Sequence, residues 1–201
     1  MYKFQIIFVI FFLGFMACSW TSERATSWTS TKNDSIVTKQ GNYYMLVSVS
    51  PKKYRVKWGN EKKSFVSEKI FEQISREPTL SESSKDAIVL TESCGSFCSH
   101  TIILSLSGNV KDFSFVKAIS LDKNLVAIGD PNGEKLLLIE NFVNGKTKTI
   151  EIETCPAANK AECIDFCKFS GNLLILKYQG NKWATNSPDP KELSVDIADL
   201  Q

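Results

Sequence analysis

The residues best suited to chemistry lie in one short stretch between Glu92 and His100. It holds Cys94 and Cys98, four positions apart around Gly95, and it ends at His100, the only histidine in the chain. Two thiols and an imidazole at this spacing could support thiol redox chemistry, bind a metal ion or form a nucleophile pair. Each of these uses makes its own demand on the elements around the stretch.

We expect strands on both sides of this stretch, and flanking strands do not favour any of the three uses. A redox pair is usually Cys-x-x-Cys at a helix N-terminus, whereas the spacing here is one residue longer. A metal site built from Cys94, Cys98, His100 and a later cysteine would need thiolates that escape oxidation. His100 shares strand parity with Ile102, Leu104 and Leu106, so we expect it at the rim of a buried face. We therefore predict no catalytic residue, no metal site and no cofactor.

The beginning of the chain predicts export. Lys3 is the only charge in the first 22 residues, and residues 4–15 are almost wholly apolar. This run fits the hydrophobic region of a signal peptide and is too short for a membrane span of about 20 residues. It ends in Phe15-Met16-Ala17-Cys18, which resembles the lipobox of bacterial lipoproteins, although its first two residues depart from the usual pattern. The resemblance covers residues 1–18 alone.

That resemblance implies cleavage of residues 1–17 and lipidation of Cys18, which would bind membrane lipid and hold an exported protein at the cell envelope. An uncleaved anchor, or ordinary signal peptidase cleavage nearby, is the alternative. Nine of the 17 residues in 19–35 are Ser or Thr, so we expect an unpacked tether there. The formal net charge is +2, and removing Lys3 leaves +1. A near-neutral balance argues against a nucleic-acid partner.

Residues 36–183 predict one antiparallel, mainly β domain, and residues 184–201 read as a C-terminal tail. Short apolar runs are separated by turn dipeptides, of which Asn144-Gly145 is the strongest hairpin signal. Residues 116–152 resemble propeller blades, but the chain is short for a propeller at about 40 residues per blade, so we expect a sandwich or a partly closed sheet. One short helix is expected between Ser67 and Arg76, where apolar residues recur at helical spacing. The predicted core contains Val47, Val56, Trp58, Leu104, Leu138 and Leu176.

Five cysteines remain if Cys18 is lipidated, and an exported chain meets an oxidising compartment. Cys94 and Cys98 close a tight loop that suits a disulfide. If residues 164–169 form a strand, the Cα atoms of Cys163 and Cys167 lie about 13 Å apart and cannot be bridged. We therefore predict disulfides Cys94–Cys98 and Cys155–Cys163, with Cys167 a free buried thiol. A short helix over residues 157–168 would instead favour a 163–167 pair.

These observations favour a non-enzymatic, lipid-anchored binding or accessory module, with a possible envelope protein as its partner. One alternative is an envelope enzyme or thiol-redox factor that works through Cys94, Cys98 and His100. Another is an inhibitor that presents the 94–98 loop to an enzyme. The sequence contains no phosphate-binding loop and no Gly-x-Ser-x-Gly nucleophile turn.

Overall fold

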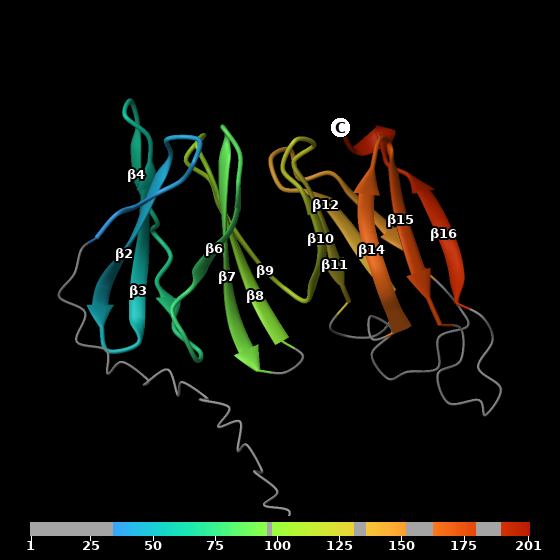
Figure 1. Cartoon of the computed structure of the whole chain (residues 1–201), viewed down its shortest axis with the longest axis horizontal. Coiled ribbons are helices and arrows are strands. Elements are labelled where there is room, and N and C mark those ends of the chain that lie inside the picture. Colours follow the sequence, from blue (N-terminus) through green and yellow to red (C-terminus); the bar gives the residue numbers. More distant parts are fainter. Residues whose placement is uncertain (1–33, 96–97, 131–135, 152–162, 180–189) are drawn as a thin grey trace, which may run out of the picture. The chain divides into compact units, whose positions relative to one another are not determined.

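The computed structural model describes residues 34–95, 98–130, 136–151, 163–179 and 190–201. The described chain is mainly β and antiparallel, as the sequence predicted. Its strands are distributed over four sheets, whereas we expected a sandwich or one partly closed sheet. Figure 1 shows these sheets coloured in chain order, from blue to red.

The first two sheets are built from residues 36–114. Sheet A contains β1 (Ile36–Val37), β2 (Tyr43–Ser50), β3 (Lys53–Gly59), β4 (Ser64–Val66) and β5 (Phe71–Glu72). Sheet B contains β6 (Thr79–Ser83), β7 (Ala87–Gly95), β8 (Cys98–Ser105) and β9 (Val110–Ser114). Apart from β5, which returns to pair with β3, strands adjacent in the chain are neighbours in the sheet.

The other two sheets follow the same meander order. Sheet C contains β10 (Val116–Ser120), β11 (Leu125–Gly129), β12 (Leu137–Asn141) and β13 (Thr147–Ile150). Sheet D contains β14 (Ile164–Ser170), β15 (Leu173–Tyr178) and β16 (Lys191–Asp196), after which the 3-10 helix η2 (Ala198–Leu200) follows. Sheet C is the four-stranded unit that the blade-like pattern of residues 116–152 indicated. Its last hairpin turns at Asn144-Gly145, and Gly145 has a φ of 75°, a conformation that side chains disfavour.

Three hydrophobic cores join consecutive sheets. The core between sheets A and B contains Tyr44, Tyr54, Val56, Trp58, Phe71, Ile88, Leu90, Ile102 and Leu104. The core between sheets B and C contains Ala87, Val89, Ile103, Leu121, Val126 and Phe142. The core between sheets C and D contains Leu125, Ala127, Leu136, Leu137, Ile139, Ile150, Ile164, Leu174, Leu176, Ile197 and Leu200.

This arrangement explains two different sequence patterns. Successive side chains of a strand point to opposite faces of its sheet, and sheets B and C have a core on each face. Neighbours such as Ile88 and Val89 therefore enter different cores, which is why the strands of these sheets read as unbroken apolar runs. Sheet A has one core face, so β3 alternates buried residues with Arg55 and Lys57.

The predicted core is right at four positions and wrong at two. Val56, Trp58, Leu104 and Leu176 are each at most 1% exposed. Val47 is only half-buried, because it lies opposite Arg55 on the face of sheet A that points away from the core. Leu138 is also half-buried, and its neighbours Leu137 and Ile139 fill the core in its place.

Two element predictions are wrong. The helix expected between Ser67 and Arg76 is absent, and β5 pairs with β3 in that segment. Phe71 alone of the three apolar residues behind the helical spacing is buried, while Ile70 and Ile74 are 44% and 56% exposed. Part of the expected tail is β16, which pairs with β15 and is followed by buried residues that close the last core.

Candidate functional site

A connecting segment that we call the strap, residues 67–75, joins sheet A to sheet B through polar contacts. It begins at Ser67, whose hydroxyl accepts a hydrogen bond from the Val56 amide at 3.0 Å and donates one to the Lys69 carbonyl at 2.9 Å. These bonds fix the start of the strap against β3. Further along, β5 holds it to the other end of the same strand.

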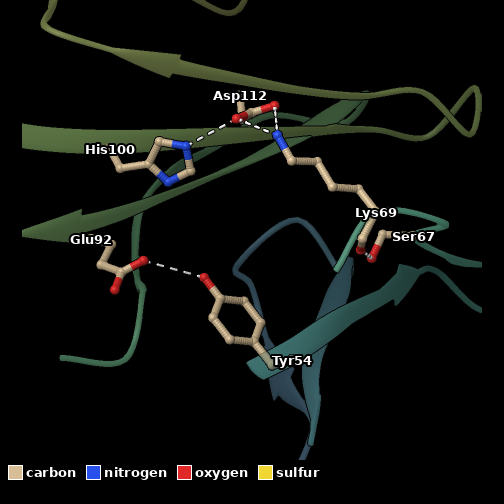
Figure 2. Close-up of polar contacts among 6 residues, drawn as sticks. All are labelled: Tyr54, Ser67, Lys69, Glu92, His100 and Asp112. Carbon is tan, nitrogen blue, oxygen red and sulfur yellow. Dashed lines mark hydrogen bonds and ion pairs between the residues drawn. The ribbon is translucent and has the colours of Figure 1, made fainter. Parts of the chain in front are cut away.

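The first polar group that the strap meets is Asp112 on β9 (Figure 2). The Lys69 ammonium donates to both carboxylate oxygens of Asp112 at 2.7 Å, and His100 Nε2 lies 3.0 Å from Oδ2. His100 pairs with Ser114 in the register of β8 and β9, so Asp112, two residues from Ser114, projects from the same face. Burial alone would raise the pKa of Asp112. The hydrogen bonds and positive charge of Lys69 and His100 outweigh it and lower the pKa.

The second polar group is Glu92 on β7, which is 1% exposed and lies directly across the strand pair from His100. Its Oε1 accepts the Ile74 amide of the strap at 2.5 Å, and its Oε2 accepts the Tyr54 hydroxyl at 3.3 Å. Burial, and secondarily the negative charge of Glu92, raise the pKa of Tyr54 far above its ordinary value. Tyr54 therefore stays a neutral hydrogen-bond donor from sheet A to sheet B.

Phe71 fills the space between these two polar groups. Its ring stacks on that of Tyr54, with the two ring centroids 5.6 Å apart. The centroid of the His100 ring lies 6.5 Å away, and the Lys69 ammonium lies 5.5 Å from the Phe71 centroid. The cluster is thus packed around an aromatic side chain. Cation–π and aromatic contacts of this kind add to the stability of the interface between the sheets.

The chemistry open to this cluster is limited. An acid–base histidine needs a nucleophile or a substrate proton within hydrogen-bond reach. Among the described residues the His100 ring is hydrogen-bonded to Asp112 and to no hydroxyl or thiol. The same part of the chain contains no group of three or more His, Cys, Asp or Glu side chains arranged to hold a metal ion. The arrangement is suited to holding sheet A, the strap and sheet B together.

The predicted cysteine sites fall partly outside the described structure. In the hairpin of β7 and β8, Cys98 pairs with Gly95, the residue that directly follows Cys94. The side chains of these two cysteines are not among those described, and Cys155 lies outside the described residues, so both disulfides stay predictions. Cys163 has no exposed surface.

Cys167 is a free thiol on β14, half-buried against the core between sheets C and D. Burial raises its pKa to about 11, although the charge of Lys117 acts in the opposite direction. A thiol with a raised pKa is protonated at neutral pH and therefore unreactive. The structure does not bring Cys167 to His100, since their side chains face two different cores.

The strap contacts and one surface were missed from the sequence. The face of sheet A that points away from its core, which we call the outer face, carries Val37, Tyr43, Met45, Val47, Lys53, Arg55, Lys57, Val66 and Glu72. Residues 36–72 hold eight Lys or Arg and three Glu, a net charge of +5, while residues 73–201 carry −4. The near-neutral total conceals this asymmetry. Charge counted over sequence windows would have revealed it.

Comparison of the chain with models of known protein families gives no match, and no curated protein sequence matches it. In the described parts of the chain, no helix has the length and apolar character needed to cross a membrane.

Proposed function

We propose that this protein is a membrane-anchored lipoprotein of the cell envelope whose β domain is a non-enzymatic binding or accessory module. Residues 1–18 support the anchor, because an apolar run leads into Cys18 in the pattern of a lipobox. Residues 19–35 then supply the tether between the lipid and the domain. An envelope protein remains the partner that we expect for the module.

The observation that carries the non-enzymatic role is the state of the two carboxylates beside His100. Asp112 is bonded to Lys69 and His100, and Glu92 is bonded to Tyr54 and the Ile74 amide. Both carboxylates therefore bond to the strap. A catalytic acid or base must instead reach a substrate.

The thiol-redox alternative is less well supported by the backbone. Cys94 and Cys98 stand at the ends of two paired strands, β7 and β8. The described residues of this hairpin are all in strands, so they include no helix N-terminus of the kind that lowers the pKa of a redox thiol. The binding role has in its favour the outer face of sheet A, which displays both aliphatic and cationic side chains.

The anchor is tested by Cys18→Ala in cells grown with labelled palmitate. We expect the variant to lose the label and to leave the detergent phase, because several acyl chains on this one residue provide the stable attachment. Cys167→Ala is the matched control, since it removes a thiol from the folded domain and should change neither result. Unchanged labelling and partition of Cys18→Ala would refute the anchor.

The non-enzymatic role is tested by His100→Ala. This variant removes one hydrogen bond to Asp112 and should cost about 1 kcal/mol of stability. The proteins recovered with it from solubilised membranes should match those recovered with the wild type. Loss of an envelope phenotype in a variant that melts near the wild-type temperature and still recovers the same proteins would favour the enzyme.

A further inference from the structure

The outer face of sheet A alternates aliphatic and cationic side chains across its strands. Residues directly opposite in an antiparallel pair share a face. Val47 lies opposite Arg55, and Lys57 lies opposite Met45 on one side and Val66 on the other. Two of these outer-face valines are largely exposed, Val37 at 65% and Val66 at 51%. Every cation in the middle of the sheet therefore has an apolar neighbour.

The positive charge of this face is nearly uncompensated. Lys53, Arg55 and Lys57 project from β3, and Glu72, opposite Lys53, is the only acidic residue that the strand register adds to the face. Sheet D, at the other end of the series of sheets, offers a natural comparison. On its solvent-facing side Lys177 forms an ion pair with Glu192 at 3.4 Å, and Asp196 lies opposite Leu173. That face carries both signs of charge, so of the two described outer faces only that of sheet A is mainly cationic.

We propose that the outer face of sheet A docks onto a bilayer that contains anionic lipids. Lys53, Arg55 and Lys57 would lie among the lipid phosphates. Val37, Val66 and their aliphatic neighbours would enter the boundary between headgroups and acyl chains. Surfaces that combine basic and aliphatic side chains bind membranes through both terms, electrostatic attraction and buried apolar area. This inference deepens the proposed function, because it assigns the anchored domain a second contact with the membrane.

A bilayer fits this face better than a nucleic acid does. Proteins that bind single-stranded nucleic acids stack bases on aromatic side chains, and those that bind duplexes rely on contacts to phosphates and base edges. The most exposed apolar side chains of this face are aliphatic, since Val37 is 65% and Val66 is 51% exposed. Aliphatic side chains contribute nothing to phosphate recognition, but they gain free energy on leaving water for lipid.

The proposed anchor would deliver sheet A to the membrane first. β1 begins at Ile36, and only residues 19–35 separate it from Cys18. Seventeen residues span at most about 60 Å. A domain held at that distance has a high effective concentration at the surface, so a modest affinity of the outer face is sufficient.

The test uses residues 32–201, which form a compact unit of their own and lack Cys18. Vesicles of phosphatidylcholine with phosphatidylglycerol are compared in flotation assays with vesicles of phosphatidylcholine alone. We expect binding to the anionic vesicles, weakening as salt is added. Each cation at an anionic surface contributes about fivefold to binding, so Arg55→Gln with Lys57→Gln should weaken it about 25-fold.

The matched control is Lys168→Gln with Lys177→Gln, which removes two exposed cations from sheet D and should leave vesicle binding unchanged. Val37→Ser with Val66→Ser should weaken binding severalfold at every salt concentration, because it removes the apolar contribution alone. The four side chains replaced in the control and in the valine variant are solvent-exposed. Circular dichroism checks that each variant is folded.

Three results would overturn the proposal: no binding to anionic vesicles, equal weakening by the sheet D control, or tighter binding to single-stranded oligonucleotides than to vesicles. The last of these would assign the face to nucleic acid. Because the tested chain has no Cys18, its failure would leave the proposed lipid anchor standing. Loss of palmitate labelling tests that anchor separately.

Discussion

Removing the Glu92 carboxylate should open the junction between sheets A and B. The carboxylate is 1% exposed and accepts two hydrogen bonds, from the Ile74 amide at 2.5 Å and from the Tyr54 hydroxyl at 3.3 Å. A hydrogen bond to a charged acceptor contributes about 1.5–3 kcal/mol, and the longer bond contributes about 0.5–1 kcal/mol. Glu92→Ala should therefore lower the free energy of unfolding by about 2–4 kcal/mol.

Urea denaturation of residues 32–201 measures this loss as a shift of the midpoint at unchanged slope. Glu92→Gln keeps an acceptor oxygen and should cost only about 1 kcal/mol. Glu72→Ala is the matched control, because Glu72 lies on the same strap but is exposed, and its loss should stay within about 0.5 kcal/mol. Amide hydrogen exchange adds a local measurement, since the Ile74 amide should exchange faster in Glu92→Ala.

The reasoning would be refuted if Glu92→Ala lost less than about 1 kcal/mol while the Ile74 amide stayed protected. That result would mean that the carboxylate does not tie the strap to sheet B. A double-mutant cycle with Tyr54→Phe then separates the two bonds, because the hydroxyl can couple only to the Glu92 oxygen that it contacts.

Three further predictions concern Asp112, the two disulfides and Cys167. The pKa of Asp112 is lowered on folding, so its ion pairs stabilise the protein above about pH 4, and this contribution is lost as pH falls through the lowered pKa. The stability gap between wild type and Asp112→Asn should therefore shrink in acid melts, and a constant gap would contradict it. Non-reducing peptide mapping should find links 94–98 and 155–163. Cys167, with its pKa near 11, should be alkylated only after unfolding, and rapid native labelling would count against its burial.

The sequence predicted the strands whose two faces meet different surroundings. Tyr54 to Trp58 alternates apolar and charged residues, and the structure buries the apolar ones. Where a strand is apolar on both faces, the sequence pattern cannot tell which residues are fully enclosed. It therefore does not separate Leu138 from Leu137 and Ile139, which are the buried ones. The helix at Ser67–Arg76 failed because its spacing came from few residues, of which Phe71 alone enters a core.

The candidate site was predictable in its strand positions and not in its partners. Parity with Ile102 placed His100 on a buried face, and the structure confirms that placement against Phe71. Lys69 and Asp112 are 43 positions apart in the chain, so nothing local to either residue indicates their ion pair. In the sequence, nothing distinguishes Glu92 from any other carboxylate on a strand. Only the structure shows that the strap covers it.

The order of the three cores has a consequence for how the domain comes apart and how it forms. Each core joins two sheets that are consecutive in the chain, so most stabilising contacts form between nearby segments, as they do in repeat proteins. Sheets A and D have one core each and should fray before sheets B and C. A mechanical load applied through the N-terminus enters at β1, on the edge of sheet A. The hairpins would then unfold one after another along the chain. The hydrogen bonds of Glu92 to Tyr54 and to the Ile74 amide would be the first polar contacts between two sheets to oppose this unfolding.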